Sequence, residues 1–238
     1  MATGRIYRPE QGAGILELPE IGRLHIGMKN ERGFPQSIDW FRPTGKYAEL
    51  FTRALGEKPQ TIQIIFPADD PEKVCNERYE YRDDKGALCA RGDGKEFEVW
   101  DGTKYAPFSI EQYPNIMQNV MQKYPTKKGM ESWVVSLTLR FIVPAVRGVV
   151  GVWQFSTRGA ASSIKNIRNS FDGVQQLRGT VTQTVFDLSV AFQKSNKPGS
   201  QSRYPVVSLV ANDQRIDEVR KFIAPPENLS LLLREPKK

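Results

Sequence analysis

The clearest pattern along the chain is an alternation of apolar and other residues between positions 133 and 142. The apolar set is Trp133, Val135, Leu137, Leu139 and Phe141. Successive side chains point to opposite faces of a β-strand, so this segment is predicted to be a strand with one strongly apolar face. Residues 184–193 repeat the pattern, and residues 204–211 are predicted to be their hairpin partner.

Shorter runs predict a set of further strands. They cover residues 23–29, 61–66, 74–81, 87–91, 96–100 and 152–155. The three runs between residues 74 and 100 are separated by turn sequences, DDKG and GDG, and are therefore predicted to form an antiparallel meander.

Helices are predicted in four places. Residues 46–55 have apolar positions at helical spacing, with Thr44 as the expected N-cap and Gly56 as the stop. Residues 110–123 are a second candidate, although Pro114 limits where that helix can begin. A third helix follows the strand at 152–155, is capped by Ser156 or Thr157, and packs through Ile164, Ile167, Phe171 and Val174. The fourth covers residues 214–223.

These elements predict an α+β fold with a largely antiparallel sheet, either curved or barrel-like, and a few packed helices. Residues 1–20 are expected to be irregular, residues 21–224 to form a single domain with a sub-boundary near 125–129, and residues 225–238 to be a basic tail. No apolar run reaches the roughly 18 residues of a membrane helix, and the N-terminus has no signal-peptide core. A cytoplasmic protein without a membrane partner is expected, in the host cytoplasm if a phage encodes it.

Charge is distributed unevenly along the 238 residues, whose net charge is +7. Residues 1–139 hold 19 Lys and Arg against 20 Asp and Glu, whereas residues 140–238 hold 15 against 7. A segment this basic favours a polyanion, of which nucleic acid is the commonest in a cytoplasm, although a solvated basic face is the simpler alternative.

The basic segment supplies the candidate nucleic-acid contacts. Lys165 and Arg168 lie opposite the apolar stripe of the third helix, and the loop around residues 194–203 could clamp a backbone. Trp153 and Tyr204 could stack on bases, with core packing as the alternative for each. The predicted nucleic-acid-binding residues are Arg140, Arg147, Arg158, Lys165, Arg168, Lys194, Lys197 and Arg203.

Catalytic and metal-binding signatures are weak. The chain has no GxxxxGK[ST] loop, and no potential nucleophile accompanies His25, its one histidine. Cys75 and Cys89 lack zinc-finger spacing and are expected to be buried thiols, bridged only if they face each other on a hairpin. The Asp69-Asp70 pair is interpreted as a capped turn rather than a metal site, and the RGDG sequence at residues 91–94 as a hairpin turn. We therefore expect no catalytic residues, no enzyme activity, no metal and no cofactor.

Four blocks of sequence resemble a known family. They are GRLHIGMKNERGFPQSIDWFRPT, TIQIIFPADDPEKV, RGDG and WQFSTRGAASSIKNI, all between residues 21 and 211. In order and spacing they are similar to the recombination directionality factors of serine-integrase phages and to related proteins of integrative elements. The resemblance implies a mobile-element protein that acts with a serine integrase on DNA and switches it from integration to excision. The metal-binding label of some relatives is not carried over, because only two cysteines are present.

Three functions remain open from the sequence. The first is an accessory factor of phage or mobile-element recombination that contacts a recombinase and binds DNA. The second is a single-stranded DNA-binding protein of phage replication or annealing. The third, least supported, is a metal-dependent hydrolase that uses Asp69, Asp70 and Asp93.

Overall fold

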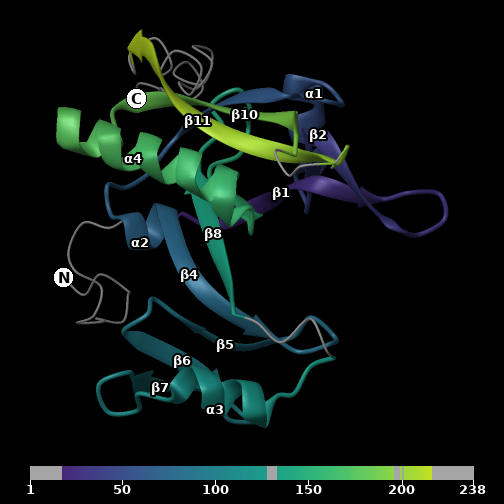
Figure 1. Ribbon diagram of the computed structural model, residues 1–238. Helices are drawn as coiled ribbons and strands as arrows, with labels where there is room; N and C mark the ends of the chain where they lie inside the picture. Colours follow the sequence, from purple (N-terminus) through teal and green to yellow (C-terminus); the bar gives the residue numbers. More distant parts are fainter. Residues whose placement is uncertain (1–17, 128–132, 196–198, 200, 216–238) are drawn as a thin grey trace, which may run out of the picture.

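The computed structural model describes residues 18–127, 133–195, 199 and 201–215, and its strands form two sheets (Figure 1). The larger sheet has eight strands in the order β2-β1-β9-β8-β4-β5-β6-β7. Their bounds are β1 Glu20–Lys29, β2 Pro35–Thr44, β4 Cys75–Arg82, β5 Leu88–Gly92, β6 Glu96–Trp100, β7 Tyr105–Ser109, β8 Val134–Phe141 and β9 Val152–Thr157.

The connectivity of this sheet explains why the fold is α+β. Strands β4 to β7 follow one another as antiparallel hairpins, β8 and β9 are also antiparallel, and β1 runs parallel to β9. β2 and β7 form the two edges of the described sheet, so the sheet is open. The predicted fold class is confirmed, and the barrel-like alternative within it is wrong.

The smaller sheet has the order β11-β10-β3, with bounds Arg203–Arg215, Thr184–Lys194 and Thr61–Ile65. Its apolar side chains line up across the strands. Leu188 lies opposite Ile62 on one side and Leu209 on the other, and Phe186 lies opposite Ile64. Such cross-strand rows give this sheet one apolar face.

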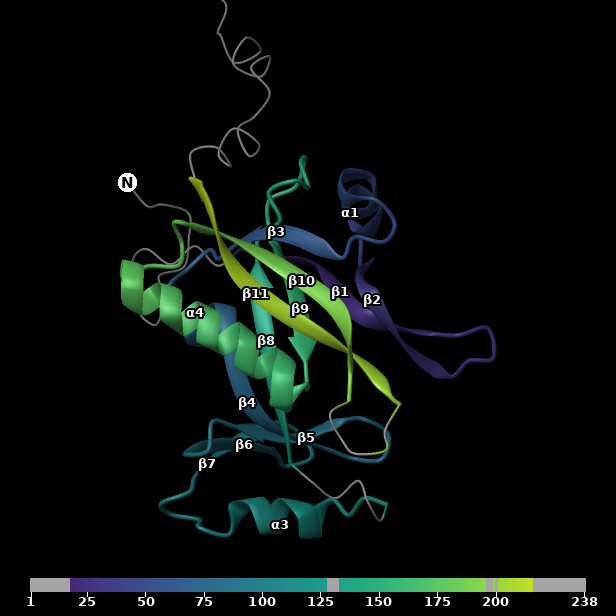
Figure 2. The same ribbon diagram turned by 45° about the horizontal axis from the view of Figure 1, so that its top comes forward.

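The main core lies where that face meets the apolar face of the larger sheet. Leu137, Leu139 and Phe141 of β8 are buried in the same cluster as Phe186 and Leu188 of β10. Figure 2 shows the smaller sheet lying across β8 and β9, with a long helix beside β11. This two-layer packing leaves the opposite face of β8 and β9 outside the main core.

Helices complete the main core. Helix α4 (Lys165–Arg178) continues from a π-helical turn, Ala160–Ile164, and buries Ile167 and Phe171 as predicted. The ring centroid of Phe51, from α1 (Ala48–Leu55), lies 4.9 Å from the ring centroid of Trp153 in β9.

A second, smaller core lies at the other end of the large sheet. Helix α3 (Ile116–Lys123) packs Ile116 and Val120 against a cluster that includes Tyr81, Phe97 and Val99. The Tyr81 hydroxyl donates to the backbone oxygen of Tyr124, just after the helix. The meander predicted for residues 74–100 is confirmed, and β7 is an additional strand that the sequence analysis did not predict.

Several predicted boundaries are wrong. Helix α1 begins at Ala48 because Thr44 is the last residue of β2, and the N-cap Tyr47 makes no side-chain capping bond. Helix α3 begins at Ile116 rather than at residue 110, two residues after Pro114, which cannot lie in the interior of a helix. The helix predicted for residues 214–223 falls mostly outside the described residues, and Gln214 and Arg215 belong to β11.

The N-cap predicted for the third helix is also wrong. Gly159 precedes the π-helical turn and no side chain caps it. Thr157 Oγ1 instead accepts a hydrogen bond from the Gly159 N–H at 3.2 Å, which orders the turn before the helix.

Candidate nucleic-acid interface

The face of the large sheet that lies opposite the main core carries polar and charged side chains. On β8, Ser136, Thr138 and Arg140 alternate with the buried apolar residues of the same strand. On β9, Gln154 and Ser156 alternate with Trp153 and Phe155 in the same way. Alternation along each strand therefore produces one apolar and one polar face.

Strands β4 and β1 extend this polar face on either side. In the register of the sheet, Asn76 of β4 lies opposite Thr138, which lies opposite Ser156. Arg140 lies opposite Gln154, which in turn lies beside Arg23 of β1. The polar residues thus form continuous rows that cross several strands.

The rows line a hollow of about 730 Å³, which we call the basic groove. Its cationic residues outnumber its acidic residues, Glu72 and Glu80, by seven to two. The cationic residues are Arg23, Lys73, Arg78, Arg82, Arg91, Arg140 and Arg158. The lining residues thus carry an excess of five positive charges, and such a concave surface attracts anions. Three of the cations also pair with carboxylates outside the lining, Arg23 with Glu20, Lys73 with Asp70 and Arg91 with Glu98.

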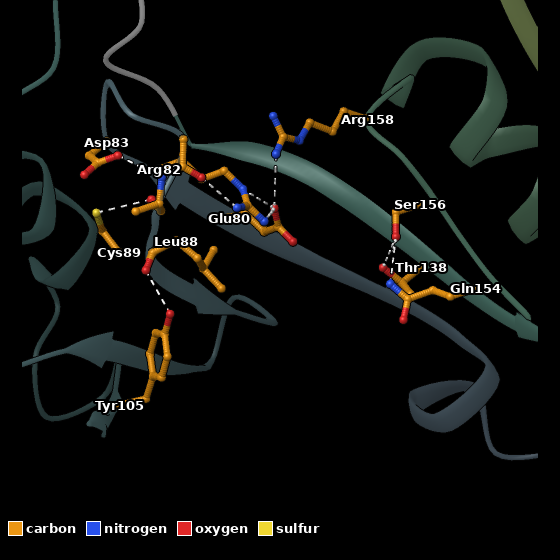
Figure 3. Close-up of polar contacts among 12 residues, drawn as sticks. Glu80, Arg82, Asp83, Leu88, Cys89, Tyr105, Thr138, Gln154, Ser156 and Arg158 are labelled. Atoms are coloured by element: carbon orange, nitrogen blue, oxygen red, sulfur yellow. Dashed lines mark hydrogen bonds and ion pairs between the residues drawn. The ribbon is translucent and has the colours of Figure 1, made fainter. Parts of the chain in front are cut away.

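Glu80 occupies the middle of a cationic cluster in the groove. Its carboxylate lies 3.0 Å from Arg82 Nη2 and 3.6 Å from Arg158 Nη2, and its side chain is only 17% exposed (Figure 3). Arg82 is also anchored by a bond from Nη1 to the Gly86 carbonyl at 3.0 Å. One carboxylate therefore faces two guanidinium groups, which leaves this cluster with a positive charge.

Arg78 and Arg140 are the cations with the least compensation. Arg78 Nε donates to Asn76 Oδ1 at 2.9 Å, a neutral partner. Within the described part of the chain, no carboxylate lies within 4.0 Å of either guanidinium. Both side chains are half-buried among polar neighbours. Their guanidinium groups are the ones best placed to bind an anionic ligand by donating hydrogen bonds to it.

Neutral hydroxyl and amide groups form the floor between these cations. Thr138 Oγ1 and Ser156 Oγ share a hydrogen bond of 3.0 Å, and Gln154 Nε2 donates to the same Ser156 oxygen at 3.5 Å (Figure 3). Hydroxyl and amide side chains are common partners of phosphate oxygens.

His25 lies at the β1 side of the groove. Its Nε2 is 3.0 Å from Thr44 Oγ1, which donates its own proton to the Arg23 carbonyl. Loss of hydration, followed by the positive charges of Arg42 and Arg23, lowers the pKa of His25. The imidazole is therefore neutral at pH 7 and acts as a hydrogen-bonding group there.

The structure separates the eight predicted nucleic-acid residues. Of the seven that belong to the described residues, Arg140 and Arg158 alone line the basic groove. Lys194 and Arg203 face each other at the end of the β10–β11 hairpin, Arg147 follows β8, and Lys165 begins α4. Lys197 lies outside the described residues.

Arg168 was predicted to lie on a basic face of the third helix that is free of acidic partners, but it has two such partners. Its guanidinium lies 2.6 Å from Glu77 on β4 and 3.6 Å from Asp172 on the next turn of the helix. The helix face opposite its apolar stripe is therefore partly neutralised by acids, one of them distant in sequence.

Sequence reasoning missed most of the groove. Arg23, Lys73, Arg78, Arg82 and Arg91 all belong to the half of the chain whose net charge is −1. The available signal was the alternation in the predicted strand 74–81, which places Asn76, Arg78 and Glu80 on one face. The total charge of residues 1–139 concealed these cations, because most acids of that part lie outside the groove lining, where only Glu72 and Glu80 are acidic.

The aromatic candidates do not contribute to this surface. Trp153 is 1% exposed in the main core, whereas Tyr204 is 39% exposed on β11 in the other sheet. The described residues that line the groove include no Phe, Tyr or Trp. The groove is thus built for charge and hydrogen bonding, without stacking platforms.

The carboxylates considered for metal chemistry have structural partners. Asp70 caps the one-turn helix α2 (Pro71–Val74) by accepting from the Glu72 N–H at 3.0 Å, as the interpretation of a capped turn predicted. Asp93 accepts from the Lys95 and Glu96 amides in the β5–β6 turn. In the described ranges, no three His, Cys, Asp or Glu side chains come together as a metal site would require.

The cysteines are free and buried, as predicted. Cys75 pairs with Leu139 in the sheet, so it does not face Cys89 on a hairpin. Burial raises the pKa of the Cys75 thiol to about 12, which keeps it protonated and unreactive at neutral pH.

The fold and the basic groove define an α+β protein with an open, cationic sheet surface. Over residues 21–212 the chain matches the model of a family described as Gp3-like, recombination directionality factor-like, and it belongs to that family. The resemblance stated from the sequence is confirmed. No curated protein and no solved structure matches the chain. Among the helices of the described residues, none has the length and apolar character needed to cross a bilayer.

Proposed function

We propose that this protein is an accessory factor of phage or mobile-element DNA recombination that holds the DNA backbone in the basic groove while acting on a site-specific recombinase. Family membership supports the recombination role. The observation that supports the DNA contact is the excess of five positive charges among the residues that line the basic groove.

The chemistry of the groove favours phosphate over bases. Arginine guanidinium groups bind phosphate oxygens through paired N–H donors, and the hydroxyl and amide floor adds neutral donors. Such contacts position DNA without reading its sequence. Sequence selectivity would then come from the recombinase rather than from this protein.

The alternative of a single-stranded DNA-binding protein is less well supported. Proteins of that class combine a cationic groove with aromatic side chains on which successive bases stack. The described groove residues provide the charge but no Phe, Tyr or Trp. We therefore expect duplex DNA to bind at least as tightly as a single strand of the same length.

Fluorescence anisotropy with labelled duplex and single-stranded oligonucleotides at low salt tests this proposal. The variant Arg78→Gln with Arg140→Gln removes the two groove cations that have no carboxylate partner among the described residues, and we expect it to weaken duplex binding at least about tenfold. Arg53→Gln with Lys104→Gln is the matched control, because both residues are exposed and lie outside the groove.

Two results would overturn the proposal in different ways. Equal effects of the groove variant and the control would show that the groove is not the DNA contact. A strong preference for the single strand would favour the single-strand-binding alternative.

A further inference from the structure

The outer half of the β1–β2 hairpin, residues 26–37, projects from the sheet and is here called the arm. Strand β9 pairs with β1 only as far as Leu24. Beyond a bulge between His25 and Gly27, β1 pairs with β2 alone, through Gly27, Met28 and Lys29. Figures 1 and 2 both show this two-stranded ribbon extending away from the other strands.

The tip of the arm is fixed by its own hydrogen bonds. Asn30 Oδ1 accepts from the amides of Arg32 and Phe34, at 3.0 and 2.9 Å. Asn30 N–H also donates to the Phe34 carbonyl at 2.9 Å, and Gly33 takes the positive φ of 80° that the turn requires. These hydrogen bonds order the turn at the tip of the arm.

This ordered tip presents apolar side chains to solvent. Phe34 is 64% exposed and Met28 is 38% exposed, and neither belongs to the described hydrophobic clusters. A two-stranded ribbon gains little stability by itself, so an exposed phenyl ring at its tip is not explained by folding. Phe and Met are enriched at protein–protein interfaces, where rigid aromatic anchors contribute most of the binding energy.

The charges of the arm argue for a protein partner rather than DNA. Lys29, Glu31 and Arg32 leave a net charge of only +1 on residues 26–37. Glu31, at the tip, would face phosphates unfavourably if the ribbon entered a DNA groove. The basic groove has five excess charges, so the two surfaces differ in the ligand that they suit.

We propose that the arm is the surface that contacts the recombinase, with the Phe34 ring inserted in an apolar pocket of that protein. This inference rests on the proposed function. Strand β1 links the two surfaces, because its inner half supplies Arg23 and His25 to the basic groove and its outer half forms the arm. A recombinase on the arm and DNA in the groove would be held in a fixed relation by one strand.

Isothermal titration of the full chain against the purified recombinase encoded in the same genetic element tests the inference. Phe34→Ala is expected to weaken this binding at least about 30-fold, as loss of an aromatic anchor does. Leu177→Ala is the matched control, because Leu177 is 88% exposed on α4, away from the arm, and should change nothing. Circular dichroism verifies that both variants are folded, and duplex DNA binding of each variant is measured in parallel.

Each outcome decides a separate question. Wild-type affinity in Phe34→Ala would overturn the role of the arm and leave the proposed function in place. If the wild-type protein itself fails to bind the recombinase, both the arm and the recombinase part of the proposed function are wrong. If Phe34→Ala instead weakens DNA binding and leaves recombinase binding intact, the arm is a DNA contact and the inference fails.

Discussion

At the scale of single residues, Glu80 is the most informative position in the basic groove. It lies within ion-pair distance of both Arg82 and Arg158, in the place where an anionic ligand would be expected (Figure 3). The carboxylate satisfies these arginines in the free protein, and a phosphate would have to compete with it. Glu80 therefore orders the cationic cluster and, if the groove binds DNA as proposed, would limit its affinity for phosphate.

Neutralising this carboxylate should strengthen DNA binding. Glu80→Gln raises the charge excess of the groove from five to six and keeps a side chain of the same shape, so we expect duplex affinity to rise about two- to fivefold at low salt. Anisotropy titrations of wild type and variant measure this change. Glu57→Gln, an equal charge change at an exposed position after α1, controls for overall charge. An affinity gain of the same size in this control would contradict a local role for Glu80.

At the scale of elements, Asp69 connects segments that lie far apart in the sequence. Its Oδ1 accepts from Thr180 Oγ1 at 2.7 Å and from the amides of Val181 and Thr182 at 2.7 and 3.0 Å. Gln175 of α4 also donates to the Asp69 carbonyl. The linker between β3 and α2 is thereby tied to the connection between α4 and β10.

The ionised form of Asp69 should stabilise the fold. Partial burial acts to raise the pKa of Asp69, but hydrogen bonds from Thr180, Val181 and Thr182 lower it overall. A folded-state pKa below the unfolded value gives stability that is present above about pH 4 and is lost as pH falls through the folded pKa. We expect Asp69→Asn to lower the free energy of unfolding by about 1–2 kcal/mol at pH 7.

Urea unfolding of both proteins at neutral and acidic pH measures this difference. The two stabilities should converge as the pH falls below about 4, because the wild-type carboxyl then becomes protonated. A gap that stays constant across this range would show that the charge of Asp69 contributes nothing.

Elements with a strong period were predictable from the sequence. The alternation of Trp133 to Phe141 identified β8, and the turn sequences at residues 83–86 and 92–94 identified the β4–β5–β6 meander. Helix starts were less accessible. Thr44 is a residue type that often caps a helix, but here it ends β2, because the pairing of β2 with β1 outweighs its preference for the N-cap position.

The site was harder to predict than the elements. The parallel contact between β1 and β9 brings Arg23 beside Gln154, although the two residues are 131 positions apart in the sequence. No local pattern encodes that pairing. Arg140 and Arg158 were predicted because they belong to a basic segment, whereas Arg78 and Arg82 required the register of the whole sheet.

At the scale of the whole molecule, the two sheets have different roles. The smaller sheet and α4 cover the apolar face of β8 and β9, which fixes those strands in the main core. The opposite face thereby carries polar side chains without loss of core packing, and the neighbouring elements β1, α2, β4 and β5 add most of the seven cations of the groove. The arm extends the same large sheet beyond its neighbours, so one rigid framework supports both proposed contacts.

The salt dependence of duplex DNA binding tests the central claim, a DNA backbone held in the basic groove, most directly. Each phosphate contact contributes about 0.9 to the slope of log affinity against log salt concentration. We predict that Arg78→Gln with Arg140→Gln makes this slope shallower by about 1.8, while Arg53→Gln with Lys104→Gln leaves it unchanged. Identical slopes for the wild type and the groove variant, or no DNA binding at low salt, would contradict the claim.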